Sequence, residues 1–388
     1  MLIKKTYTKI ALSKYIFFFV MLIPAFLTYR ADLEIIYDGW HILQLLITVG
    51  IVLIYVFKCR FDNIIVNCAL IYYVFAIISS FYNGYSINTI KWDIAADIGV
   101  SIGAYLLMKR NRRNFLNVIA NILFVYLIIN TITMLIYPGG IASGRIGQIV
   151  WFLGGKNNIL PWILIGAGCL FLNSIERYRT ITKRTYLKVA LCSIQAFLCD
   201  SSTAVTLVII LWLLYLVNGV LHNSKIMNTI LSGKKIILFV AVGFIALIFF
   251  TTESNILQNI SAWFGKDITF NGRTAIWGIA LKYIAEHPFI GAGPVLTFDM
   301  GWGVDMTHAH CLYLNVCAHY GVFALAAIIF CVWNALKRSN LIPSIVYYSL
   351  FLYLIGSIVE VYSLNSLLLF CVILGYYGSN LKNRRDEL

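Results

Sequence analysis

Apolar runs of roughly membrane-spanning length recur from one end of the chain to the other. A transmembrane helix needs about 20 predominantly apolar residues. Twelve segments reach or approach that length: 15–29, 41–57, 64–81, 93–108, 115–137, 158–173, 186–199, 202–217, 236–250, 311–333, 343–359 and 362–378. Only 12% of the 388 residues are charged, against about 25% in soluble domains. The sequence therefore excludes a soluble or disordered chain and predicts an all-α integral membrane protein with about 12 transmembrane helices.

The basic residues alternate between the predicted loops. With the N-terminus inside, the cytoplasmic segments hold 23 of the 30 Lys and Arg residues and the opposite side holds 7. Cytoplasmic loops carry such an excess, so we expect both termini in the cytoplasm and residues 1–388 to form a single polytopic membrane domain. The net charge of +14 is then explained by loops that face anionic headgroups of the membrane lipids, and no nucleic-acid partner is expected.

Two predicted external loops are longer than the others, namely 138–157 and the large external loop 251–310. Long loops in compact proteins often carry function. In the large loop, residues 273–286 place apolar side chains at helical spacing, which predicts an interfacial helix lying on the membrane. The His287-Pro288 pair is expected to end this helix.

Two carboxylates fall within a predicted span, four residues apart on one helix face. Asp93 and Asp97 lie just after Lys91. Ionisable groups inside the bilayer are costly and are candidates for function. The run becomes strongly apolar only after Asp97, so we favour a position for both in the outer headgroup layer.

The large loop and the smaller one also bring together groups suited to phosphate chemistry. Arg145 and Arg273 lie in glycine-rich segments, and His308-Ala309-His310 precedes the tenth span. Arginine binds phosphate oxygens with two parallel hydrogen bonds, and histidine can take a proton from an attacking hydroxyl. The arginines could instead anchor to lipid headgroups. We expect His310 as the proton acceptor, with Arg273 and Arg145 on a pyrophosphate.

Three further residues are candidates for a supporting role. His308 could share the pocket of His310, while Asp299 and Asp305 could orient sugar hydroxyls or the histidine. The histidines and aspartates do not have the spacing of a metal site, so no metal and no cofactor is expected.

The large loop resembles the signature of O-antigen polymerases and O-antigen ligases. The resemblance rests on Gly272-Arg273, Trp277, His287–Gly293, His310-Cys311-Leu312-Tyr313-Leu314 and Gly321. Nine residues separate Cys311 from Gly321, as in the family pattern. Cys311 stands where the family usually has Asn, Ser or Gln, and Ala324 where it usually has Gly, Thr or Tyr. A second partial match runs from Arg145 to Gly154-Gly155-Lys156-Asn157-Asn158.

This resemblance implies a metal-independent, inverting glycosyltransferase of the membrane-embedded GT-C type in a bacterial cytoplasmic (inner) membrane. Its substrates would be undecaprenyl-pyrophosphate-linked glycans as donor and acceptor, and a flippase and a chain-length regulator would be its partners. A polymerase extends repeat units into O-antigen or capsular polysaccharide, whereas a ligase transfers the glycan to lipid A-core. We favour the polymerase because of the high aromatic content (24 Tyr, 25 Phe and 9 Trp) and the departure at Cys311.

A transporter is the competing class, for example a flippase for lipid-linked oligosaccharide. Transporters place polar sites near the membrane midplane, often in paired broken helices or internal repeats. The chain shows no such repeat, and its spans are almost uncharged at the middle. The polar external loop therefore favours an enzyme.

Overall fold

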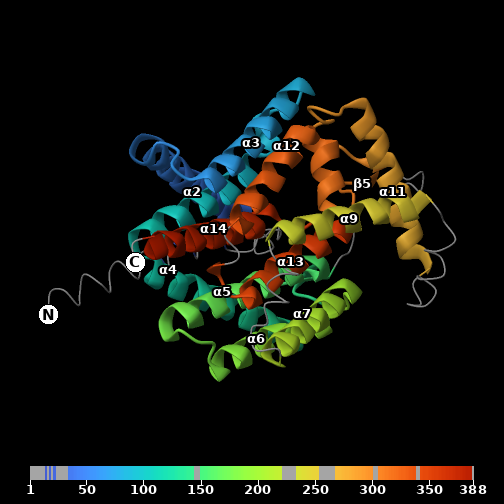
Figure 1. Ribbon diagram of the computed structural model, residues 1–388. Coiled ribbons are helices and arrows are strands. Elements are labelled where there is room, and N and C mark those ends of the chain that lie inside the picture. The colour runs from blue at the N-terminus through green and yellow to red at the C-terminus, as the bar shows by residue number, and fades with distance from the viewer. Residues whose placement is uncertain are drawn as a thin grey trace.

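A computed structural model describes residues 14, 17, 18, 21, 22, 34–143, 149–220, 233–252, 267–299, 305–337 and 341–386. In these residues the chain is mostly helical. The α-helices are α2 (Glu34–Ile54), α3 (Ile64–Tyr82), α4 (Lys91–Ile136), α5 (Ile159–Tyr178), α6 (Lys183–Leu198), α7 (Ser202–Val220), α9 (Gly233–Thr252), α11 (Asp267–Glu286), α12 (Leu312–Leu336), α13 (Ser344–Val359) and α14 (Leu364–Asp386). Figure 1 shows them gathered into one bundle.

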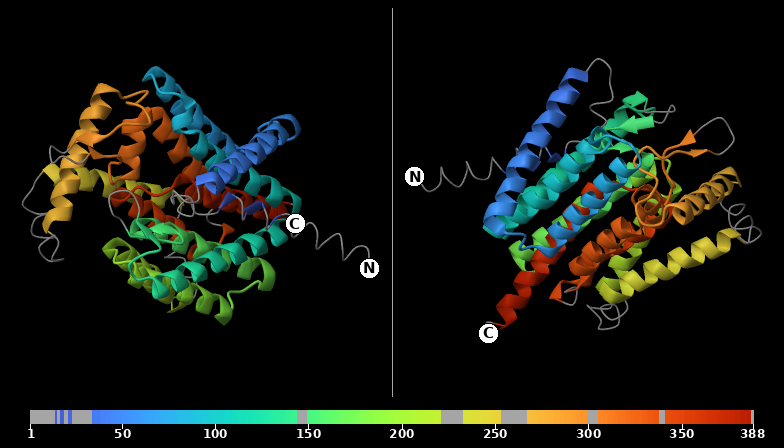
Figure 2. Two further views of the ribbon diagram at one scale, coloured as in Figure 1. Left: turned by 180° about the vertical axis from the view of Figure 1, so that it is seen from behind. Right: turned by 90° about the horizontal axis from the view of Figure 1, so that it is seen from above.

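Two small antiparallel sheets accompany the helices. The first has strands β1 (Ala142–Ser143), β2 (Ile149–Trp151) and β3 (Gly154–Gly155) in that order, and the second pairs β4 (Phe298–Asp299) with β5 (Asp305–Met306). In the right view of Figure 2, both sheets lie at one end of the bundle and the C-terminus lies at the other. Both sheets come from the two predicted external loops.

Apart from one or two residues at their ends, the predicted spans from 41–57 onward lie on helices wherever the structure describes them. Helix α4 carries two of these spans, 93–108 and 115–137. Between them its backbone leaves the helical region at Asn111 (φ −162°, ψ 92°). The first predicted span, 15–29, falls mostly outside the described residues. Among the described residues, six helical stretches are long and apolar enough to cross a membrane by length and composition. The chain is therefore a multi-pass membrane protein.

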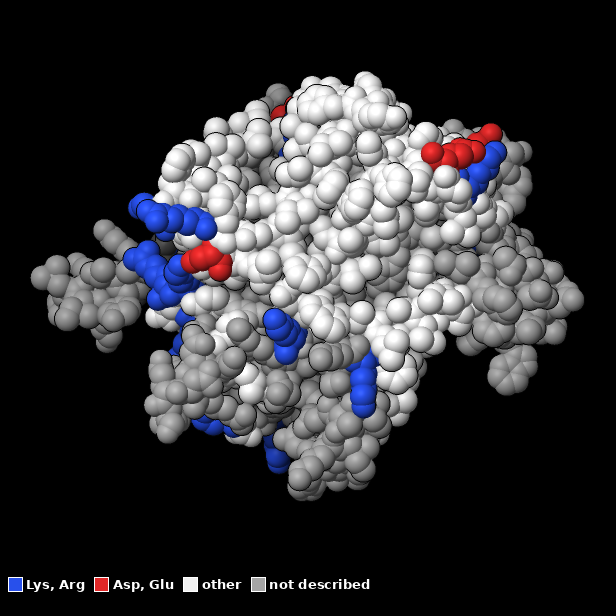
Figure 3. Space-filling view, turned by 45° about the horizontal axis from the view of Figure 1, so that its top comes forward, with Lys and Arg blue, Asp and Glu red and all other residues white. Residues whose placement is uncertain are grey.

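The bundle exposes an apolar surface of the kind that lipid covers. Leu46 of α2, Leu135 of α4 and Ile245 of α9 are each more than 60% exposed. Exposed side chains of this kind are suited to contact with lipid tails, which are as apolar as leucine. In Figure 3, charged side chains gather at the left and at the upper right, a few Lys or Arg side chains lie in the lower middle, and a broad uncharged surface occupies the rest of the described face.

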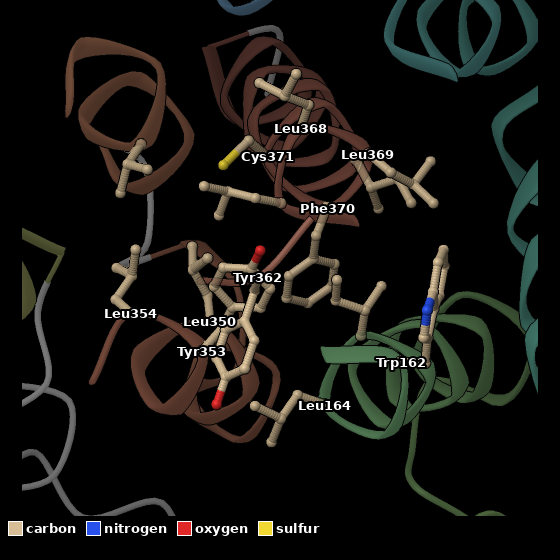
Figure 4. Close-up of a cluster of buried hydrophobic side chains, with 14 of the residues drawn as sticks. Trp162, Leu164, Leu350, Tyr353, Leu354, Tyr362, Leu368, Leu369, Phe370 and Cys371 are labelled. Carbon is tan, nitrogen blue, oxygen red and sulfur yellow. The ribbon is translucent and has the colours of Figure 1, made fainter. Parts of the chain in front are cut away.

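The centre of the bundle is formed by α5 packed against α13 and α14. Every residue of α5 from Ile159 to Leu172 is buried. Figure 4 shows Phe370 of α14 between Trp162 of α5 and Tyr353 of α13. Gly168 allows this approach, since a Cβ atom there would overlap the Phe370 ring. A helix that is apolar all round is suited to this central position.

Polar contacts join loops that the charge pattern places on the same side. At the predicted cytoplasmic end, Lys109 pairs with Asp62 at 2.5 Å, and Arg112 pairs with Glu176 at 2.8 Å. At the other end, Arg273 pairs with Glu360. The packing of the helices therefore agrees with the alternation of basic and non-basic loops.

The two carboxylates of α4 have different surroundings. Asp93 is exposed, whereas Asp97 is buried and accepts a hydrogen bond of 2.6 Å from the Tyr73 hydroxyl of α3. Asp97 therefore lies inside the bundle between two helices. The two carboxylates therefore do not share the same surroundings, although they lie four residues apart on one helix.

Helix α11 covers the predicted interfacial segment 273–286 and ends at Glu286, as the His287-Pro288 pair predicts. In Figure 1 and in the left view of Figure 2 it crosses the direction of α9 steeply. Ile276, Trp277 and Ala280 form its buried face, and this face packs on α12. One-sided burial is the pattern of an amphipathic helix, and the position of α11 on the membrane surface stays a prediction.

Candidate functional site

Glu360 is the centre of a polar cluster at the end of the bundle that carries the two sheets. It is the residue at which α13 ends, its backbone is extended, and its side chain is only 4% exposed. Arg273 of α11 donates from Nη2 to Glu360 Oε1 at 2.5 Å and from Nη1 to the Val359 carbonyl at 3.0 Å. The guanidinium is therefore hydrogen-bonded to both the Glu360 side chain and the Val359 backbone at the end of α13.

A second set of hydrogen bonds reaches Glu360 from the predicted external loop 138–157. Asn157, in the short 3-10 turn before α5, donates from Nδ2 to Glu360 Oε2 at 3.0 Å. The Ser201 hydroxyl, between α6 and α7, donates to Asn157 Oδ1 at 3.4 Å. Four separate parts of the chain therefore meet around one carboxylate, and all four are predicted to face outward.

His310 lies beside the same carboxylate. Its Nδ1 atom is 3.7 Å from Glu360 Oε2, and its side chain is 16% exposed. This distance is roughly 0.5–1 Å longer than the usual N–H···O hydrogen bond. A shift of that size would allow His310 and Glu360 to form one. The ring of His308 lies 4.4 Å from that of His310, measured between centroids.

The backbone between the two histidines is held from both sides. The buried Trp277 indole of α11 donates to the Ala309 carbonyl at 2.8 Å, and Ala309 N donates to Asn315 Oδ1 of α12 at 2.9 Å. His310 itself has φ +49°. A non-glycine residue in this left-handed region is uncommon and persists where its surroundings fix it. Trp277 and Asn315 therefore set the position of both imidazoles.

The glycines of the sequence signature allow a loop to pack directly on an opened helix. Gly321 has φ +83° and ψ 175° within α12, so its backbone leaves the helical region there. The loop after α11 uses this opening: Ala292 N donates to the Ala318 carbonyl, Gly293 N to the His319 carbonyl, and Val322 N to the Pro288 carbonyl. A Cβ atom at Gly291 or Gly321 would overlap the facing backbone. The motif thus fixes α11 to α12.

The charges of the cluster affect one another. Burial raises the pKa of Glu360, but the nearby His310 ring and the Arg273 charge together lower it below its usual value. Burial, with the neighbouring His310, lowers the pKa of His308 to about 4. At neutral pH the cluster therefore contains an ionised Glu360, a cationic Arg273 and a neutral His308. A neutral imidazole such as that of His308 can accept a proton from a hydroxyl.

The structure brings together three of the predicted site residues, Arg273, His308 and His310. Arg145 lies outside the described residues. Asp299 is exposed on β4, where its backbone pairs with Asp305 of β5, and the side chain of Asp305 is also outside the described part. Among the described residues, no group of three His, Cys, Asp or Glu side chains is placed to hold a metal ion.

Sequence reasoning missed Glu360 and Asn157 as site residues. Glu360 lies between the predicted spans 343–359 and 362–378, and Asn157 enters only through the second partial match. A signal for Glu360 was present, because it is the only charged residue in 343–378. A lone carboxylate between two apolar spans is costly and is a candidate for function by default.

Residues 187–329 match the O-antigen ligase family. The matched segment, less than half of the chain, includes Arg273, Trp277, both histidines and Gly321, while Asn157 and Glu360 lie outside it. No curated protein matches the chain. The resemblance to O-antigen polymerases and ligases is thereby confirmed over this segment. The match supports a polysaccharide-assembly function of the kind that polymerases and ligases share.

Proposed function

We propose that the protein polymerises undecaprenyl-pyrophosphate-linked oligosaccharide repeat units at the outer face of the cytoplasmic membrane. In this proposal it is a GT-C-like glycosyltransferase with twelve spans and both termini in the cytoplasm. The observation that carries the proposal is the joining of Arg273 and His310 through Glu360. A phosphate-binding cation and a proton acceptor are thus held side by side at one end of the bundle.

The reaction needs one bond to form and one to break. The acceptor hydroxyl attacks the anomeric carbon of the donor sugar from the face opposite the pyrophosphate, so the configuration inverts. The bond between that carbon and the pyrophosphate oxygen breaks, and undecaprenyl pyrophosphate leaves with the electron pair. The hydroxyl proton passes to Nε2 of His310, the ring nitrogen that does not face Glu360. The pyrophosphate bond already activates the donor, so no metal or nucleotide is needed.

Arg273 is suited to the leaving group. A guanidinium has five N–H donors, and two of its nitrogens already each donate one hydrogen bond, to Val359 and Glu360. Three N–H groups remain for phosphate oxygens on a side chain whose orientation is already fixed. Donors that are positioned before the reaction stabilise charge as it develops. We place Arg145 on the same pyrophosphate as a second cation.

Glu360 acts through its neighbours and is a positioning residue. Its carboxylate orients Arg273 and faces Nδ1 of His310. When His310 takes the proton from the acceptor, its positive charge forms 3.7 Å from an ionised carboxylate. Asn157 holds the second carboxylate oxygen and so keeps Glu360 aligned between both partners.

Ligase activity is the second candidate, favoured by the match to the O-antigen ligase family. A ligase would use the same donor site and the same proton acceptor. Its acceptor hydroxyl would belong to lipid A-core in place of a second lipid-linked repeat unit.

One reconstitution separates these functions. The purified protein in detergent receives synthetic lipid-linked repeat units alone, with EDTA present. We expect a ladder of longer lipid-linked products, and an Arg273→Lys variant should fail to make it. Product that forms only after lipid A-core is added would establish a ligase. If vesicles show movement of substrate between leaflets and neither acceptor is extended, the protein is a transporter and the proposal is wrong.

A further inference from the structure

A cavity of about 280 Å³ opens at the other end of the bundle, beside the bend in α4. It is lined by Asn111, Arg113, Asn114, Asn117 and Arg177. All five side chains are polar or cationic, and they come from the middle of α4, next to its bend, and from the last turn of α5. This end carries the basic loops that the charge pattern assigns to the cytoplasm. Nothing in the proposed transfer reaction uses it.

The cavity carries uncompensated positive charge. The nearby Glu176 pairs with Arg112 at 2.8 Å, and both side chains are only 10% exposed. Glu176 also accepts a hydrogen bond from Tyr377. Within the part of the chain that the structure describes, no carboxylate forms an ion pair with Arg113 or Arg177. Two guanidinium groups therefore face the cavity with their charge available.

The bend in α4 arranges the polar wall of the cavity. Asn111 leaves the helical region, and its Oδ1 accepts a hydrogen bond from Asn114 N at 2.9 Å, so it caps the second half of the helix. Arg177 Nη1 donates to Asn117 Oδ1 at 3.0 Å, which holds this guanidinium against the wall. A fixed arginine beside amide donors matches the oxygens of a phosphate group.

Asn121 extends this polar wall along the same face of α4, where it donates to Asn117 Oδ1, and exposed apolar side chains follow beyond it. Successive helical residues turn by about 100° and rise 1.5 Å, so Asn114, Val125 and Ile132 lie within roughly 20° of one face. Val125 is 50% exposed and Ile132 is 48% exposed. Val125 lies about 16 Å along the helix from Asn114, within the depth of one leaflet. A phosphate in the cavity would thus be followed by a surface for acyl chains.

We propose that this cavity binds one anionic phospholipid of the inner leaflet, with its phosphodiester between Arg113 and Arg177 and its acyl chains along the exposed face of α4. A free phosphate would use the arginines but would leave these exposed apolar side chains uncovered. Binding of the lipid stabilises the junction of α4 and α5.

Native mass spectrometry and thermal unfolding of the full-length protein in detergent test this site. Phosphatidylglycerol should be retained at one molecule per chain and should raise the unfolding temperature, because a ligand of the folded state stabilises it. Phosphatidylcholine should bind about tenfold more weakly. Replacing Arg113→Gln and Arg177→Gln together should lower phosphatidylglycerol affinity by about tenfold or more, since each removes a charge-assisted hydrogen bond. Arg184→Gln, an exposed arginine of α6 outside the cavity, should leave the affinity unchanged.

Three results would overturn the assignment. They are equal retention of the two lipids, unchanged affinity in the double variant, and a stabilisation by millimolar inorganic phosphate that equals that of phosphatidylglycerol. If the double variant does not fold, Asn114→Leu, which fills the cavity and keeps both charges, must lower the affinity in its place.

Discussion

The Glu360 carboxylate lies 2.5 Å from Arg273 Nη2 through one oxygen, while its other oxygen faces His310 Nδ1 at 3.7 Å. Glu360 follows α13, and Arg273 belongs to α11, 87 residues earlier in the chain. The contact therefore ties the large external loop to the turn between the last two helices. It also places an ionised carboxylate between a cation and a titratable ring.

Replacing the central carboxylate tests this relationship. Glu360→Gln keeps the shape but leaves Arg273 without its counter-charge, and breaking a buried pair in this way costs about 3–5 kcal/mol of stability. We expect a lower unfolding temperature and a fall in chain extension of about 10²-fold. Glu286→Gln, an exposed carboxylate at the end of α11, should change neither quantity. Normal extension by Glu360→Gln would exclude a role for the carboxylate in the site.

Single alanine variants of the two histidines distinguish their roles. His310→Ala should reduce turnover by about 10²–10⁴-fold while donor binding stays near normal, because loss of a general base appears in the chemical step. His308→Ala should have a smaller effect on turnover. Both are compared at equal membrane abundance by single-turnover extension and donor-binding assays. The opposite ranking would move the proton acceptor to His308.

The geometry of Arg273 makes a conservative change informative. Arg273→Lys keeps a positive charge but loses the planar fork that contacts Val359, Glu360 and the proposed pyrophosphate. We expect about 10²–10³-fold slower extension, measured as products per chain over time. Lys282→Ala removes a cation from the same helix at an exposed position and serves as the control. Recovery of most activity by lysine would show that Arg273 supplies charge alone.

Gly321 offers a test of the junction between the loop and α12. Gly321→Ala places a Cβ atom against the Phe289 carbonyl at a backbone with φ +83°, and we expect a loss of about 1–3 kcal/mol. Gly278→Ala on α11 has open space around it and should be neutral or stabilising by up to about 1 kcal/mol. Thermal unfolding in detergent compares the two. Equal stability of both variants would contradict the close packing of this loop.

Acidification should weaken the fold through His308. Its folded-state pKa is lowered from 6.5 to about 4, so the unfolded chain binds the proton more readily. The stability that this histidine contributes is complete above about pH 6.5 and is lost as the pH falls towards 4. Thermal unfolding between pH 7 and 4 should show this loss in the wild type, and His308→Gln should show less of it. Equal pH dependence in both proteins would contradict the lowered pKa.

Much of the site was accessible from the sequence because its parts lie in one loop. The spacing from Arg273 to Gly321 indicated a shared signature, and the family match covers that segment. Glu360 and Asn157 come from distant turns, and their contacts depend on how α5, α11 and α13 pack. No local pattern encodes a pairing of that kind, so these two residues were missed.

The sequence by itself determined which segments are helical and apolar, and which loops carry the basic charge. Both follow from local properties: the length of an apolar run, and the excess of Lys and Arg in alternate loops. Tertiary structure decided that Asp97 is enclosed by α3, that α12 opens at Gly321, and that one carboxylate joins Arg273 to His310. These features depend on which helix faces which neighbour, and that choice is made by packing over the whole bundle.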